Sequence, residues 1–469
     1  MELVEIAAWA IGILLFLIIT TFLLKKFAKA QTFYIGSMIK TTKPLPLFDR
    51  FAEHKTILNA FADFGLVLGF GAIGIDYLFG KKLKAIPRII LFIASIALLT
   101  IAFNLVFSSL LSSPFTEKYS YLMALGFGVM GFAGFMVVTL AVYAEYVITN
   151  ALMGAKSCPG VAPLIPGVSL PKFPVTIPLH GWISLLIILI VHEGMHGILA
   201  RKALVKIKST GLLLIGIFPI GAFVEPDEGQ LKRTREKDQL RVFSAGPTAN
   251  LAAAAVFAVL YFTVFAAIIN VSLLEYKQNV AKVVISNVDQ NIDVCGQISP
   301  SPAFGKLDKN MVVIAINGKN ISSAEDWSNQ LREIGKNTYF LTLQKDQNSP
   351  DKNVFQATIT PDSMGYQGYT VQDQLKPDTK FSPYYIYFVL SLSFISSFLF
   401  WFWILNFLVG IANFMPLEPF DGGKITKLIL LPYLGFWKVP QEQKEKAIGK
   451  IFFWLVLALL ILNAVPFLL

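Results

Sequence analysis

The residues with the clearest chemistry are two histidines and a glutamate inside an apolar segment. In residues 181–200, GWISLLIILIVHEGMHGILA, His192, Glu193 and His196 fall in the last third. His192 and His196 are four positions apart, so both imidazoles lie on one face of a helix, with Glu193 to the side. This is the HExxH arrangement, in which two neutral His nitrogens bind zinc and the Glu handles the proton of a water molecule.

The alternative interpretation is that these are polar residues packed between helices. Ionisable side chains inside a membrane-length segment are costly, and a bound metal explains why three of them are tolerated. Histidine is scarce, with 4 in 469 residues, and two of the four fall in this motif. We therefore expect one zinc ion per chain at this position.

The overall composition is that of a multi-pass membrane protein. Hydrophobic residues make up 55% of the chain, charged residues only 15%, and the mean hydropathy is +0.61. The net charge of +10 does not indicate nucleic-acid binding, because Lys and Arg lie mainly in short loops beside apolar runs. The expected surroundings are the lipid bilayer and other membrane proteins, and the oligomeric state stays open.

Apolar runs predict about eight transmembrane helices. They cover residues 3–24, 57–79, 89–111, 121–148, 181–200, 239–270, 385–415 and 451–469. The charges around the first run predict an extracytoplasmic N-terminus, and strict alternation then places the C-terminus outside and the metal towards the cytoplasmic side. The same alternation places the basic loop 81–88, KKLKAIPR, outside, which contradicts the charge rule, so the orientation of this loop stays open.

The chain divides into five parts. Residues 1–150 hold four transmembrane helices, 151–180 form a Pro-rich extracytoplasmic connector, 181–272 and 384–469 are the two halves of a membrane core, and 275–380 are a polar extracytoplasmic insertion. Cys158 and Cys295 both fall on the outer side, where a disulfide is one possibility. Strand-like runs, an Asn317–Gly318 turn and a helix after Ser322 or Ser323 predict an α+β domain for the insertion.

Residues 210–224, TGLLLIGIFPIGAFV, are too short and too rich in Gly and Pro for a spanning helix. Non-helical backbone at membrane depth needs protein or a water-filled cavity beside it. We expect a re-entrant β-hairpin near the metal, whose exposed edge pairs with an unwound substrate as a strand. The alternative is a surface hairpin without this role.

A catalytic zinc usually has three protein ligands and one open position. His54 lies in a basic loop and His180 on the outer side, so neither suits as the third ligand. Asp421 suits better, because it follows an aromatic span, precedes Gly422–Gly423, and lies on the same expected side as His196.

HEGMH together with NFMPLEPFDGG resembles the site-2 protease pattern HExxH…NxxPxxxxDG, and the SPA…ING…EDW run between them resembles the PDZ domains of membrane proteases. The long N-terminal part is similar to archaeal members of this family. The resemblance implies that His192, His196 and Asp421 bind zinc and that Glu193 is the general base. It implies further that the hairpin around Gly221, Ala222, Phe223 and Val224 holds the substrate as a strand. It also implies that Asn413 binds the substrate backbone or steadies the oxyanion; a helix-terminal cap is the other interpretation of Asn413.

The predicted function is that of an intramembrane zinc endopeptidase that cuts transmembrane segments in regulated intramembrane proteolysis. Two alternatives are considered. One is a different membrane zinc protease, of the kind that trims prenylated C-termini, which needs no inserted PDZ domain. The other is a transporter or scaffold with a structural metal, in which Glu193 has no proton to transfer.

Overall fold

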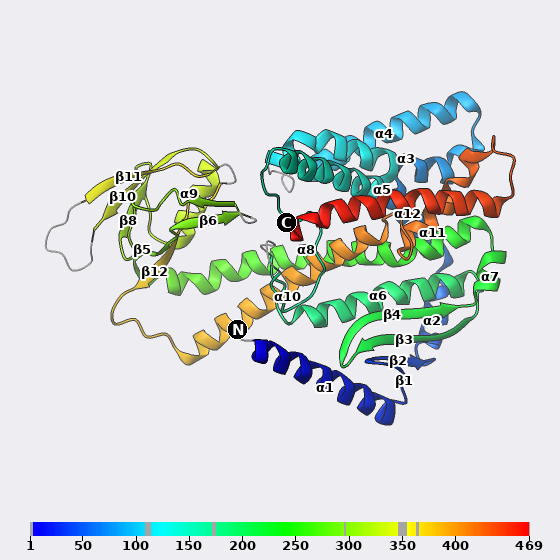
Figure 1. Cartoon of the computed structure of the whole chain (residues 1–469), viewed down its shortest axis with the longest axis horizontal. Helices are drawn as coiled ribbons and strands as arrows, with labels where there is room; N and C mark the ends of the chain where they lie inside the picture. The colour runs from blue at the N-terminus through cyan, green and yellow to red at the C-terminus, as the bar shows by residue number, and fades with distance from the viewer. Residues whose placement is uncertain are drawn as a thin grey trace.

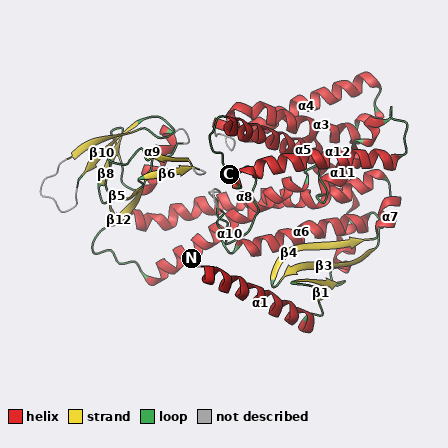
Figure 2. Cartoon of the chain, in the orientation of Figure 1, coloured by secondary structure: helices red, strands yellow, loops and turns green. Residues whose placement is uncertain are grey.

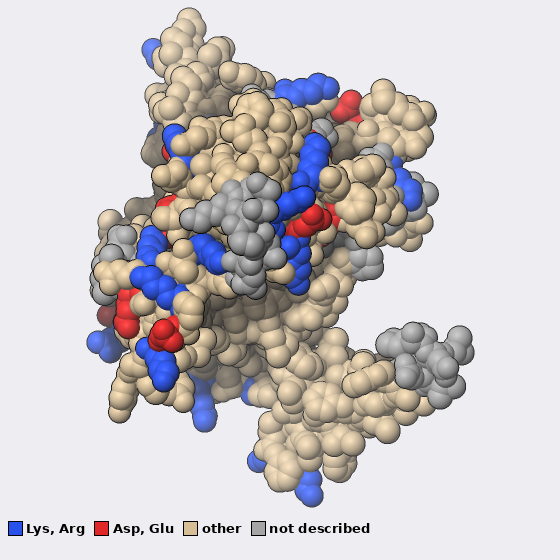
Figure 3. Space-filling view, turned by 90° about the vertical axis from the view of Figure 1, so that its left-hand side faces the viewer, with Lys and Arg blue, Asp and Glu red and all other residues tan. Residues whose placement is uncertain are grey.

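The computed structural model describes residues 3–107, 114–170, 175–294, 297–345, 354–362 and 365–468. A bundle of long helices fills most of the molecule, and the strands are gathered in two places, one beside the bundle and one beyond its end (Figures 1 and 2). Seen from that end, charged side chains are separated by wide uncharged areas (Figure 3).

Seven helices in the described part of the chain are long and apolar enough to cross a membrane. The first expected span is helical as α1, Leu3–Phe27, but several of its side chains lie outside the described set. The seven correspond to α3 (Lys55–Leu78, continued by the 3-10 turn η1, Gly80–Lys82), α4 (Ala85–Phe107), α5 (Pro114–Leu152), α6 (Gly181–Lys202), α8 (Glu236–Gln278), α10 (Pro383–Asn413) and α12 (Gln441–Ala464). Shorter helices are α2 (Leu45–Ala52), α7 (Glu228–Arg233), α9 (Ala324–Ile334), α11 (Asp421–Ile429), and the 3-10 turns η2 (Leu431–Leu434) and η3 (Val465–Phe467).

Two of these helices, α3 and α5, are not straight. The backbone of α3 leaves helical geometry at Gly71 (φ 52°), and that of α5 does so at Met130 and Gly131 (φ 53° at Gly131). In α5, the Tyr119 hydroxyl donates to Glu145 Oε2 at 2.7 Å, although a straight helix would separate these residues by about 39 Å. Each helix therefore folds back on itself as a helical hairpin.

A four-stranded antiparallel sheet lies beside α6 in the order β1-β2-β3-β4. Strands β3 (Ile207–Ile215) and β4 (Phe218–Pro226) form a hairpin over the segment in which the sequence predicts one. Strands β1 (Gln31–Phe33) and β2 (Gly36–Thr41) extend it from the N-terminal region, and sequence analysis had not predicted them. Among the described strands, β4 has a partner on one side only.

The insertion between α8 and α10 forms a six-stranded sheet with α9 packed against it. The order is β11-β10-β8-β5-β12, with β9 on β8. The strands are β5 (Val280–Val288), β8 (Val312–Ile316), β9 (Lys319–Asn320), β10 (Tyr339–Gln344), β11 (Val354–Ile359) and β12 (Tyr369–Leu375); β6 (Asn291–Val294) and β7 (Gln297–Pro300) pair separately. Ser323 caps α9 by accepting a hydrogen bond from the Asp326 amide.

The connector before α6 runs without regular secondary structure over its described residues and returns to the bundle, where Trp182 Nε1 donates to the Pro166 carbonyl at 3.2 Å. Cys158 in this connector is disulfide-bonded. Cys295, the only other cysteine in the sequence, lies outside the described residues.

Candidate metal centre

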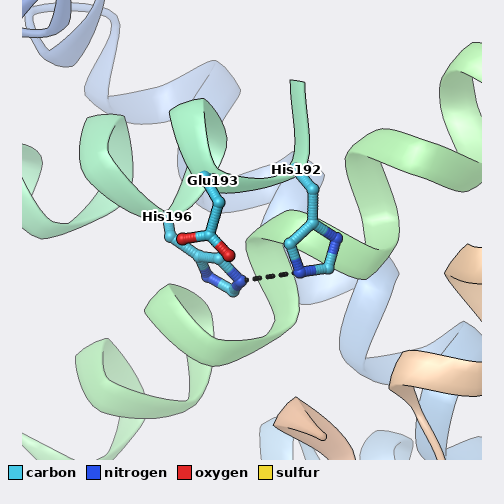
Figure 4. Close-up of side chains that lie close together, drawn as sticks. All are labelled: His192, Glu193 and His196. Carbon is cyan, nitrogen blue, oxygen red and sulfur yellow. Dashed lines mark hydrogen bonds between the residues drawn. The ribbon is translucent and has the colours of Figure 1, made fainter. Parts of the chain in front are cut away.

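Helix α6 carries three of the predicted site residues on adjacent turns. His192 is buried, and Glu193 and His196 are half-buried, so the apolar helix holds all three away from bulk solvent. The ligand atoms of the three side chains lie within 4.8 Å of one another. Figure 4 shows the two imidazoles turned toward each other, with His192 Nε2 and His196 Nε2 3.1 Å apart.

Asp421 reaches the same point from the other end of the sequence. It is the first residue of α11 and is buried, with its carboxylate near the positive end of the helix dipole. Asp421 Oδ2 lies 3.1 Å from His192 Nε2 and 3.0 Å from His196 Nε2. Two nitrogens and one oxygen therefore converge from segments 225 and 229 residues apart.

Helix α8 contacts both histidines at their Nδ1 atoms. His196 Nδ1 lies 2.7 Å from the Val242 carbonyl, which can only accept, so Nδ1 carries a proton and Nε2 presents its lone pair. His192 Nδ1 lies 3.0 Å from the amide of Asn250, which is fully buried. Asn250 ends the run GPTAN of the sixth predicted span, and sequence analysis predicted no contact between this run and His192.

Gly246 is the point of closest approach between α8 and the imidazoles. A Cβ placed on Gly246 would lie 2.4 Å from His196 Nε2 and 2.6 Å from His192 Nε2. A larger residue would therefore collide with the two nitrogens, and the absence of a side chain allows α8 to lie this close to them.

Glu193 lies beside the two histidines and also contacts the sheet. Its Oε2 accepts a hydrogen bond of 3.0 Å from the backbone amide of Val224 on β4. This contact brings one of the four predicted hairpin residues, Gly221–Val224, to the site; the neighbouring residues follow along the same strand.

Asn413 is the predicted site residue that the structure joins least directly to this cluster. It is the last residue of α10, and its Nδ2 donates to the Val409 carbonyl at 2.9 Å within the same helix. Glu418, in the loop between Asn413 and Asp421, is exposed and pairs with Lys427 at 2.8 Å. Of the other two histidines, His180 lies near Ser397, with its Nε2 3.1 Å from that hydroxyl, and His54 precedes α3.

Comparison with known proteins gives two matches. The sequence model of peptidase family M50 matches residues 180–459, which contain all of these site residues. An uncharacterized protein of Methanocaldococcus jannaschii is 28% identical over 272 residues. That alignment covers 58% of this chain and 60% of the relative's length.

Proposed function

Because the chain belongs to peptidase family M50, the site-2 protease family, we propose that it is an intramembrane zinc endopeptidase that cuts transmembrane segments of other proteins. Membership of this family makes the chain a membrane metalloprotease. The proposal that it binds zinc and cleaves within the membrane rests on one observation. His192, His196 and Asp421 bring three ligand atoms within 3.1 Å of one another inside an apolar bundle.

The donor set fits zinc in kind and in spacing. Two imidazole nitrogens and one carboxylate oxygen form a set that leaves the fourth position of a tetrahedral site open, as catalytic zinc requires. Zinc–nitrogen bonds of about 2.0–2.1 Å place neighbouring ligand atoms about 3.3 Å apart, close to the separations of 3.0–3.1 Å found here. Gly246 adds no side chain beside the two Nε2 atoms, where a Cβ would lie 2.4 and 2.6 Å from them.

When bound, zinc acts as a Lewis acid on the scissile carbonyl and lowers the pKa of water at its open position. The proton transfers belong to Glu193, which lies beside the histidines and is oriented by the Val224 amide. Glu193 takes the proton of the attacking water and later gives it to the leaving amine. Val242 fixes the tautomer of His196 throughout.

The substrate is proposed to bind as an extended strand. A helix hides its carbonyls in hydrogen bonds, so a transmembrane segment must unwind before attack, and helix-breaking residues in the substrate favour this step. The edge of β4 that has no partner among the described strands lies near Glu193 and would pair with such a segment along Gly221–Val224, apart from the Val224 amide, which donates to Glu193. Asn413 is proposed to contact the substrate backbone or the oxyanion, in which case its amide leaves the Val409 carbonyl.

The insertion between α8 and α10 is proposed to be a PDZ-like domain on the extracytoplasmic side. Its sheet with a single packed helix supports this. It would act as a docking module or size filter, so that substrates already trimmed outside are cut and a cytoplasmic fragment is released, as in regulated intramembrane proteolysis.

Two variants test the proposal. Glu193→Gln keeps the two histidines and Asp421, so we expect it to retain zinc and to lose cleavage of a test transmembrane substrate. Asp421→Ala removes the oxygen that both histidines face, so zinc content should fall sharply. Metal analysis of the purified protein and a cleavage assay measure both results; parental cleavage by Glu193→Gln would remove the proton-transfer role.

A further inference from the structure

We propose that Asn250 is a positioning residue that holds His192 in the tautomer needed for metal binding. The inference rests on the proposed zinc site, but its observation is separate from the ligands. Asn250 is fully buried, its Nδ2 lies 3.0 Å from His192 Nδ1, and its Oδ1 has no hydrogen-bond partner among the described residues.

The orientation of the Asn250 amide follows from which nitrogen of His192 carries the proton. His192 Nε2 faces Asp421 and His196, so it must present a lone pair when an ion lies between them. The proton of a neutral His192 is then on Nδ1 and needs an acceptor. The only atom of Asn250 that accepts is Oδ1, so in the proposed arrangement the amide turns half-way round and places Oδ1 where Nδ2 lies against His192 Nδ1. His192 then matches His196, whose Nδ1 faces a carbonyl.

Asn250→Leu tests this role, with Asn250→Asp as the conservative variant and Asn406→Leu as the matched control. Asn406 on α10 is equally buried and its Oδ1 also has no partner in the described part of the chain, but its Nδ2 donates to the Phe402 carbonyl and does not face a histidine. Zinc retention by the purified full chain is measured against a graded chelator. We expect about 10- to 100-fold weaker zinc binding for Asn250→Leu, with Asn250→Asp and Asn406→Leu near the parent.

The outcomes separate this inference from the proposed function. If the parent binds no zinc, the proposed function fails. If the parent binds zinc and Asn250→Leu binds it equally well, or if Asn406→Leu loses it to the same extent, the positioning role is wrong.

A second, independent inference concerns the two helical hairpins: we propose that α3 and α5 enter the membrane from opposite faces and turn back at mid-depth without crossing it. A Cβ on Gly131 would lie 2.2 Å from the Leu68 carbonyl oxygen, and one on Gly71 would lie 2.6 Å from the Gly131 amide, so the two turns touch. The second arm of α3, residues 72–78, is only about 10 Å long, against a hydrocarbon core of about 30 Å.

The open ends of the hairpins lie at opposite ends of the bundle. In α3, Asp63 pairs with Arg241 at 2.7 Å and the Tyr77 hydroxyl donates to Glu236 Oε2 at 3.3 Å, so both arms return to the start of α8. In α5, the Leu140 carbonyl accepts from Asn463, near the end of α12.

This arrangement resolves the conflict over the basic loop 81–88. Asp76, at the end of α3, pairs with Arg88 at the start of α4 and accepts from the Tyr433 hydroxyl, which precedes α12. The end of α6 is also on this side, because Lys202 pairs with Asp238. The loop therefore shares one face of the membrane with the other basic loops, as the charge rule requires.

Single cysteines at exposed positions test this topology in sealed vesicles with a membrane-impermeant maleimide. The parent is the blank, since it has no free cysteine among its described residues. Lys43→Cys marks the face on which α3 begins and Met153→Cys the opposite face, after α5. We expect Lys82→Cys to react from the same face as Lys43→Cys. Reaction together with Met153→Cys would mean that α3 crosses the membrane, and the inference would be wrong.

Discussion

At the scale of single residues, the centre depends on one position where a side chain is absent. Gly246→Ala would place a methyl group within 2.6 Å of both Nε2 atoms, so we predict a large loss of zinc. Gly194→Ala is the control, because its nearest neighbour, Phe48, would lie 3.9 Å away and alanine favours a helix by about 1 kcal/mol. Metal analysis should show loss of zinc from Gly246→Ala and the parental zinc content in Gly194→Ala. Equal zinc content in the two variants would mean that α8 moves away to make room for the added methyl group.

The site residues differ in how directly the sequence indicates them, and the difference has a physical cause. His192, Glu193 and His196 share one helix, so their spacing alone predicts that they meet. Asp421 comes from a segment more than two hundred residues away, and only its motif and its apolar surroundings indicated it. Gly246 and Asn250 were not predicted as site residues, because a contact between the backbone or amide of one helix and the imidazoles of another leaves no periodic signal.

At the scale of elements, the turn of each helical hairpin depends on a glycine with positive φ. Gly71→Ala would adopt an unfavourable backbone conformation, costing about 1–2 kcal/mol, and its Cβ would also meet backbone atoms of α5 at 2.6 Å. Gly154 has a similar φ of 72° with nothing within 4 Å. We predict that Gly71→Ala lowers the thermal stability of the purified protein more than Gly154→Ala does. Similar shifts would show that the contact between the two turns contributes little.

Two features of the helices and strands could not be predicted from the sequence. Hydropathy reports how many apolar residues follow one another, not the direction in which they run, so the sequence predicted apolar helices over residues 57–79 and 121–148 but not the turns at Gly71 and Gly131 inside them. Strands β1 and β2 were missed for another reason. They are short, with three and six residues, and they become a sheet only by pairing with β3 from another part of the chain.

The same α3 hairpin connects the N-terminal region to the loop between α10 and α11. Phe70, next to the turn, meets Phe414 edge to face at 6.4 Å between ring centroids. Gly69 allows this approach, since a Cβ there would lie 2.3 Å from the Phe414 ring. Phe414 follows Asn413 and precedes Asp421 in the same loop, so the hairpin supports the segment that carries the proposed third ligand.

At the scale of the whole molecule, the inserted domain begins and ends at one place. The Lys376 amide donates to the Asn279 carbonyl at 2.9 Å, and Lys376 Nζ donates to the Gln278 carbonyl at 2.7 Å. The chain therefore leaves α8 and returns towards α10 through adjacent residues. No described residue of the domain contacts the cluster of His192, His196 and Asp421 on α6 and α11, so we treat the domain and the centre as separable.

This separation predicts what happens when residues 280–375 are replaced by a short flexible linker. The ends to be joined are already adjacent, so the variant should keep the zinc content of the parent. If the domain excludes untrimmed substrates, the variant should cut a transmembrane segment carrying a large outer domain as readily as the trimmed form, whereas the parent cuts only the trimmed form. Paired cleavage assays on the two substrates measure this. A variant that holds zinc and still rejects the large substrate would show that discrimination lies in the membrane bundle itself.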